Sequence, residues 1–126
     1  MTEHSGDAGR EALPTSAQVE VAAETFRMLS SSTRLLIVRI LVDAEHDVTS
    51  LADLAEASVQ AVSQHLAKLR LARMVVARHA GTRVYYRLAD DHASELVSVA
   101  MHQAEHMLGT APEHIRMAER TEPDRA

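Results

Sequence analysis

The sequence predicts a mainly α-helical fold with one small β-hairpin, and three observations lead to this expectation. Apolar residues recur close to the helical period in several separate segments. Two short strand-like runs flank a glycine at position 81. The 126-residue chain has two Tyr, one Phe and no Trp, so its core must be built from Leu, Val, Ile, Ala and Met. Such a composition favours packed helices over a sandwich of sheets, and the length suits one domain.

Two helices are expected at the start of the domain. Over residues 17–29 the apolar positions follow the helical period and include Val19, Phe26 and Leu29. The polar residues 30–32 are all serine, so they are expected to end this helix and to cap a second one, from about Thr33 to Leu41. Residues 43–47 are charged, and we expect a loop there.

Residues 48–70 are predicted to form two short helices joined by a tight turn. The first contains Leu51 and Ala52 on its apolar face. The second has Val62, Leu66 and Leu69 at spacings of four and three, so its remaining faces are polar. Two short amphipathic helices in this arrangement indicate a helix-turn-helix.

A hairpin and a last helix complete the expected domain. Residues 74–77 and 83–88 are strand-like. The turn between them contains Ala80 and Gly81, and the glycine tolerates the positive φ that such a turn needs. Asp90 or Asp91 is expected to cap a final helix that runs through Leu108.

The composition also divides the chain and limits its chemistry. We expect a mobile arm over residues 1–15, the folded domain over 16–108 and a second mobile tail over 109–126. No apolar run approaches the roughly 18 residues that span a bilayer, and no signal segment is evident, so no membrane partner and a cytoplasmic location are expected. With no cysteine, any metal must be held by nitrogen and oxygen.

The charge distribution points to nucleic acid. The net charge of the chain is −5, yet residues 57–89 contain no acidic residue. The six basic residues of this window are Lys68, Arg70, Arg73, Arg78, Arg83 and Arg87. A positive surface on an acidic protein is typical of a site that meets phosphates.

The second helix of a helix-turn-helix lies in the major groove, with its early polar residues against base edges. Here the candidate base-reading residues are Gln60, Ser63, Gln64 and His65. The candidate phosphate contacts are Lys68, Arg70 and Arg73, while Arg78 and Arg83 flank the hairpin tip and can reach the backbone or the minor groove. The alternative is that these side chains form the ordinary solvated faces of a small helical protein.

At this point the sequence resembles a known family. The stretches SQHLAKLR (63–70), LARMV (71–75), GTRVYYRL (81–88) and FRMLSSSTRLLIVRIL (26–41) are similar to the winged-helix metalloregulators of the ArsR/SmtB family. The likeness covers about residues 17–108. It implies a winged helix-turn-helix that forms a homodimer through its first and last helices and binds double-stranded operator DNA. One departure is the turn EASVQ (56–60), which lacks the glycine that the family often has there.

The last helix contains candidate metal ligands at regular spacing. His102 and His106 are four residues apart on one face, with Glu105 beside them. His92 lies fourteen residues before His106 on nearly the same face, which places them about 21 Å apart along one helix axis. These two histidines can share an ion only if a second copy of the helix runs antiparallel, in a twofold dimer centred near Val99.

The resemblance implies the same arrangement, because the family's last-helix sensors bind metal across the dimer. Asp90 and His92 match the first ligand pair and His106 the last histidine, whereas the family's remaining histidine falls on Gln103. Glu105, His106 and the downstream His114 are similar to the mycobacterial nickel and cobalt sensors. More than four imidazole and carboxylate ligands suit nickel or cobalt better than zinc, although zinc stays open.

Several alternatives remain at the level of sequence. The histidines of the last helix can be plain polar surface, and we expect His46 and His79 to be surface residues in loops. His4, third from the amine if Met1 is removed, can bind nickel or copper, but a polar tail is the plainer interpretation. The prediction is a repressor released from DNA by nickel or cobalt. The rivals are a metal-independent or zinc-responsive regulator of the same family, and a small metal carrier or enzyme, for which no catalytic pair is evident.

Overall fold

The computed structural model describes residues 12–109, and within them the predicted mainly helical fold with one hairpin is confirmed. The helices are α2 (Ser16–Leu29), α3 (Ser32–Asp43), α4 (Val48–Ala55), α5 (Val59–Leu71) and α6 (Asp91–Gly109). The strands are β1 (His46–Asp47), β2 (Val75–Ala80) and β3 (Arg83–Leu88). The predictions for His4, His114 and most of the two arms lie outside the described residues.

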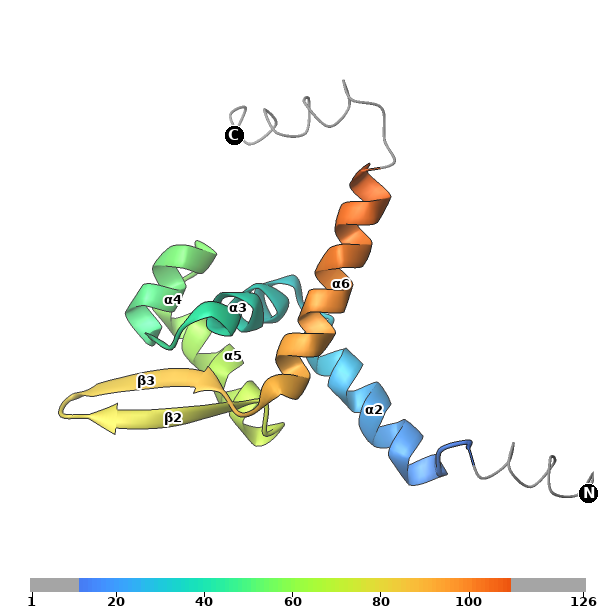
Figure 1. Ribbon diagram of the computed structural model, residues 1–126. Coiled ribbons are helices and arrows are strands. Elements are labelled where there is room, and N and C mark those ends of the chain that lie inside the picture. Colours follow the sequence, from blue (N-terminus) through green and yellow to red (C-terminus); the bar gives the residue numbers. More distant parts are fainter. Residues whose placement is uncertain (1–11, 110–126) are drawn as a thin grey trace, which may run out of the picture.

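Figure 1 shows how these elements are arranged. Helices α3, α4 and α5 form a compact group, the β2–β3 hairpin projects from it on one side, and α2 and the long α6 extend on the other. Within residues 12–109 no helix combines the length and the apolar character needed to cross a membrane.

Side chains that accept hydrogen bonds mark where four of the helices begin. Thr15 and Gln18 form a reciprocal capping box at α2, with Oγ1 of Thr15 accepting from the backbone of Gln18 at 3.1 Å. Ser31 caps α3, as the serine triplet predicted, and Ser58 caps α5. Asp47 caps α4 by accepting from the backbone N–H of Ser50.

The sheet has three antiparallel strands in the order β1-β3-β2. Ala80 pairs with Arg83, so the hairpin turn consists of Gly81 and Thr82, one residue later than predicted. Gly81 has a φ of +64° and Thr82 does not have a positive φ, a pattern that matches a type II′ turn with glycine first.

The predicted loop positions of two histidines are wrong. His46 lies in β1, where it pairs with Tyr86, is half-buried and shares a hydrogen bond of 2.9 Å with Oγ of Ser50. His79 lies in β2, although it is exposed as expected. A two-residue strand has no alternating pattern of its own, so the pairing of β1 with β3 leaves no local signal.

The core is aliphatic and centres on α3. Ile37 and Val38 of α3 are fully buried, and α3 contacts α4, α5, α6 and β3. The other fully buried large side chains are Leu51, Val62, Leu66, Leu69 and Val97. Each such side chain stabilises the fold by about 1.5–3 kcal/mol relative to its exposed state. Burial of Val62, Leu66 and Leu69 therefore fixes which face of α5 points outward.

Candidate nucleic-acid interface and metal ligands

The helix-turn-helix consists of α4 and α5, and the turn between them starts at Glu56. Glu56 adopts the left-handed conformation, with φ 52° and ψ 46°. Its backbone N–H donates to the end of α4, and the N–H of Ala57 donates to the carbonyl of Ala52 at 3.0 Å. The turn therefore closes in the usual way although glutamate occupies a position where glycine is free of strain.

The outward face of α5 contains most of the predicted DNA-contacting residues. Gln60, Ser63 and Gln64 are exposed near the start of the helix, opposite its buried residues. Lys68 and Arg70 are exposed in the last turn. This arrangement allows base contacts from the first half of α5 and phosphate contacts from the second half.

His65 is less available for base contacts than its neighbours on α5. It is half-buried, and its Nδ1 has neither solvent contact nor a hydrogen-bond partner among the described residues. Burial is the largest cause that lowers the pKa of His65, and the nearby cations Arg34 and Lys68 lower it further. Both effects favour the neutral form of the imidazole.

Arg73 follows α5 with a φ of 61°, and its N–H donates to the carbonyl of Arg70 at 2.9 Å. Within residues 12–109, Lys68, Arg70 and Arg73 form no ion pair. Their charges are therefore available to phosphates.

The two arginines that flank the hairpin tip are paired instead. Arg78 donates from Nε and Nη2 to the carboxylate of Glu45, and its guanidinium lies 4.9 Å from the centre of the Tyr85 ring. Arg83 donates from Nη1 to Oδ2 of Asp47 at 3.2 Å. The hydrogen bond from Arg78 lowers the pKa of Glu45 and raises that of Arg78.

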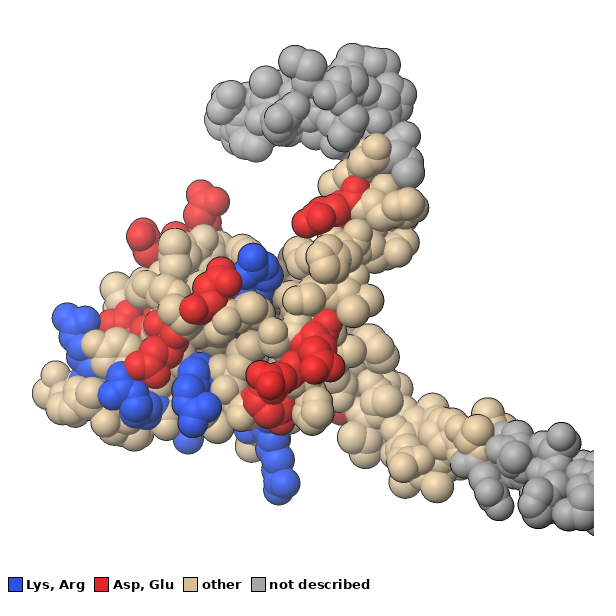
Figure 2. All heavy atoms as spheres, in the orientation of Figure 1, with Lys and Arg blue, Asp and Glu red and all other residues tan. Residues whose placement is uncertain are grey.

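Glu45 and Asp47 belong to this surface, although the sequence pattern does not predict it. Both precede the acid-free window, and the charged segment of residues 43–47 was the available signal. In Figure 2 acidic side chains are interspersed among the basic ones over the wing, which is the β2–β3 hairpin.

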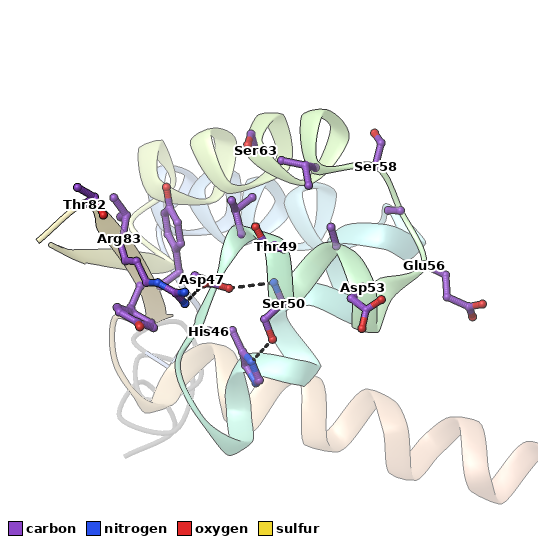
Figure 3. A pocket seen from close by; sticks show the side chains of 17 residues that line it. His46, Asp47, Thr49, Ser50, Asp53, Glu56, Ser58, Ser63, Thr82 and Arg83 are labelled. Atoms are coloured by element: carbon purple, nitrogen blue, oxygen red, sulfur yellow. Dashed lines mark hydrogen bonds and ion pairs between the residues drawn. The ribbon is translucent and has the colours of Figure 1, made fainter. Parts of the chain in front are cut away.

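An open groove of about 1350 Å³ lies between the starts of α4 and α5 and the wing (Figure 3). Its polar lining includes Thr49 of α4, Ser58 and Ser63 at α5, and Arg83 of β3. Hydroxyl groups, helix N-termini and a guanidinium are the donors that hold phosphates in protein–DNA complexes. The lining also contains the carboxylates of Asp47, Asp53 and Glu56, so the groove presents phosphate donors and acidic groups side by side.

The predicted metal ligands lie on the outer surface of α6 and at its start. They are the exposed residues Asp90, His92, His102, Glu105 and His106. Asp90 already accepts a hydrogen bond of 2.9 Å from the backbone N–H of His92 and so caps the helix. No group of three or more His, Cys, Asp and Glu side chains in the described part of the chain lies close enough together to hold an ion. Within residues 12–109, one chain alone therefore does not assemble the predicted ligands.

A helix-turn-helix with a polar reading face, followed by a two-stranded wing and basic side chains on both, defines a winged-helix DNA-binding protein. Residues 31–76 match a family model described as bacterial regulatory protein, arsR family. Over 112 residues the chain is 43% identical to the HTH-type transcriptional regulator KmtR of Mycobacterium tuberculosis, covering 89% of this chain and 85% of KmtR.

Two further comparisons also match DNA-binding proteins of this class. NmtR, another HTH-type transcriptional regulator of Mycobacterium tuberculosis, is 34% identical over 103 residues, which are 81% of this chain and 85% of NmtR. The solution structure of the homodimeric winged helix-turn-helix domain of Mb0332 from Mycobacterium bovis matches with a TM-score of 0.68 and 27% identity, covering 82% of this chain and 99% of that domain. The chain belongs to the ArsR family of DNA-binding transcriptional regulators, and it is not an enzyme.

Proposed function

We propose that this chain is a dimeric repressor that binds palindromic operator DNA and is released when nickel or cobalt binds between the α6 helices of two subunits. The observation behind the metal step is the placement of His92 and His106. Both are exposed on α6, two heptads apart, and no metal-sized cluster forms within one described chain. A regulator of this kind acts in the cytoplasm, where its DNA lies.

The DNA-binding step rests on α5 and the residues around it. Gln60, Ser63 and Gln64 offer hydrogen bonds to base edges, and His65 lies beside them with one edge buried. Lys68, Arg70 and Arg73 contact phosphates, and the wing arginines Arg78 and Arg83 reach the backbone beside them.

The dimer is supported by apolar surface on the first and last described helices. Val19, Val21 and Phe26 of α2 are 52%, 69% and 62% exposed, and Val99 in the middle of α6 is 68% exposed. Val19 and Phe26, seven residues apart, share one face of α2, and exposed apolar faces often contact a partner. A second copy of this chain fits, because the related Mb0332 domain is homodimeric and because Val99 lies midway between His92 and His106.

In an antiparallel pair of α6 helices, each interfacial site contains Asp90 and His92 of one subunit and Glu105 and His106 of the other. These donors are nitrogen and oxygen, which suit nickel and cobalt. His102 is a further candidate on the same helix, and His114, outside the described residues, is a candidate from the tail. A zinc-responsive repressor is the alternative that the same donors allow, and a metal-independent regulator is the other.

A mixed dimer tests the interfacial site directly. In a dimer of one His92→Ala chain and one His106→Ala chain, both defects fall in one site and the second site keeps all its ligands. We expect isothermal titration with Ni²⁺ or Co²⁺ to find about one tight site in this mixed dimer and none in either mutant homodimer. His79→Ala, which removes an exposed histidine from β2, is the control and should retain two sites.

Equal loss in the mixed dimer and both homodimers would show that the ligands come from one chain. Binding of Zn²⁺ in place of Ni²⁺ and Co²⁺ would favour the zinc-responsive alternative. Absence of binding in the wild type would favour the metal-independent one. The metal is expected to weaken operator binding through a coupling free energy of about 1–3 kcal/mol, measured by titrating DNA with and without the ion.

A further inference from the structure

Both arginines that flank the tip of the wing are held by carboxylates from the segment between α3 and α4. Glu45, just before β1, accepts two hydrogen bonds from the guanidinium of Arg78. Asp47, in β1, accepts from Arg83 across the groove shown in Figure 3. Because β1 pairs with β3, with Asp47 opposite Tyr85, the sheet itself places these acids beside the wing.

The acid is fixed and the arginine is the partner that can move. Oδ1 of Asp47 accepts from the backbone N–H of Ser50 at 2.9 Å, which caps α4, while Oδ2 accepts from Arg83. The side chain of Asp47 is 20% exposed and that of Arg83 is 68% exposed. When Arg83 turns toward another acceptor, the Asp47 carboxylate therefore stays at the edge of the groove.

We propose that Glu45 and Asp47 form an acidic clamp that competes with DNA phosphates for Arg78 and Arg83 and so lowers the affinity of the protein for any duplex. The clamp rests on the proposed DNA binding and adds a restraint on its strength. A phosphate that binds Arg83 must replace Asp47 as its partner and must also lie near a carboxylate that stays in place. Both requirements weaken binding, because an ion pair is lost and like charges repel.

The clamp acts on phosphate contacts, so its effect does not depend on base sequence. It also separates the basic residues into two classes. Lys68, Arg70 and Arg73 form no ion pair within residues 12–109 and bind phosphates without competition. Removing an acid of the clamp therefore strengthens binding, in contrast to any substitution among those three.

The test uses two variants that remove charge and keep the fold. Asp47→Asn retains the cap of α4, because asparagine caps helices as well as aspartate does. Glu45→Gln removes the other carboxylate, which caps no helix. Asp43→Asn is the matched control, since it makes the same charge change two residues from Glu45 but releases Arg39 of α3 rather than an arginine of the wing.

The affinities of the full-length proteins are measured by fluorescence anisotropy with two labelled duplexes at low salt. One duplex has an arbitrary sequence, and the other is selected by the wild-type protein from a random pool. Asp47→Asn and Glu45→Gln are each expected to tighten binding to both duplexes by about threefold to tenfold, the size of an exposed ion pair plus local repulsion. Asp43→Asn is expected to change it less than about twofold, and high salt should shrink all differences.

A double-mutant cycle assigns the effect to the clamp. In an Arg83→Ala background the gain from Asp47→Asn should shrink to the part that comes from like-charge repulsion, and in an Arg78→Ala background the gain from Glu45→Gln should shrink in the same way. Weaker binding by Asp47→Asn, an equal gain in the Arg83→Ala background, or an equal gain from Asp43→Asn would each overturn the clamp. A wild-type protein that binds neither duplex would instead refute the proposed DNA binding itself.

Discussion

Replacing Glu56 with glycine is expected to stabilise the protein, because Glu56 occupies the left-handed conformation at the helix-turn-helix turn. That conformation costs an L-residue about 1–2 kcal/mol. Glycine avoids this strain but loses about 0.5–1 kcal/mol through the greater freedom of the unfolded chain. The net gain in the free energy of unfolding is therefore between about 0 and 1.5 kcal/mol, with a central value of about 0.8 kcal/mol.

The surroundings of Glu56 support this net gain in the free energy of unfolding. The Glu56 side chain is exposed and forms no ion pair within residues 12–109, so no ion pair among these residues is lost with the carboxylate. The backbone N–H of Glu56 donates a hydrogen bond of 3.3 Å to the carbonyl of Asp53, and glycine retains this hydrogen bond. For a domain of this size the central value corresponds to a rise in Tm of about 3–6 °C.

The assay is thermal and urea unfolding followed by circular dichroism at one fixed protein concentration, since a dimer unfolds in a concentration-dependent way. The control is Ala67→Gly, at an exposed position inside α5, which is expected to destabilise the protein by about 1 kcal/mol. Glu56→Gly and Ala67→Gly should therefore shift Tm in opposite directions. A fall in Tm for both would refute the reasoning, because it would mean that Glu56 is not held under strain.

Three other predictions address the interface, a buried histidine and the start of α6. Gln64→Ala should weaken operator binding by roughly 1–3 kcal/mol and relax one base preference, whereas Lys68→Ala should weaken all duplexes alike and reduce the salt slope by about one; unchanged anisotropy titrations for Gln64→Ala would mean that α5 does not lie in the groove. Since the pKa of His65 is lowered from 6.5, its neutral form is favoured by folding, so its contribution to stability is complete above about pH 6.5 and is lost as the pH falls below that value; His65→Gln should flatten this part of a plot of urea midpoint against pH, and an unaltered slope would contradict it. Asp90→Asn should keep the cap of α6 and leave Tm nearly unchanged while metal affinity falls, whereas Asp90→Ala should also cost about 1 kcal/mol of stability; equal Tm values for the two variants would show that the cap is unimportant.

Elements with local signals were predictable from the sequence. The serine triplet that separates α2 from α3 and the glycine at position 81 act on their immediate neighbours, so the helix boundary and the hairpin were expected close to where they lie. The same holds for the outward face of α5, because Val62, Leu66 and Leu69 are buried and the helical period then leaves Gln60 and Gln64 outside.

Features that depend on contacts between distant residues were not predictable. Strand β1 exists because His46 and Asp47 pair with Tyr86 and Tyr85, some forty residues later, and two residues cannot show a strand pattern. The ion pair between Glu45 and Arg78 depends on that same pairing, so the sequence alone predicts only a loop for the charged segment before α4. The turn at Glu56 is hard to predict for a different reason. Its backbone adopts the left-handed conformation, which glutamate disfavours.

The wing and the candidate metal ligands share one short stretch of backbone. Beyond Leu88, the last residue of β3, the N–H of Ala89 donates to the carbonyl of Met74 at 2.9 Å, and Asp90 follows at once as the cap of α6. Further along, Ala93 and Val97 of α6 are buried in the core, where α6 packs against α3 and the end of β3. An ion bound by Asp90 in the proposed interfacial site therefore acts two residues from the end of the wing, on a helix that is also anchored in the core. In the proposed dimer, a change in the angle between the two α6 helices is therefore expected to move the wing of one subunit relative to α5 of its partner. By linkage such a coupling is reciprocal, so in the proposed mechanism operator DNA is expected to weaken metal binding by the same factor by which metal weakens operator binding.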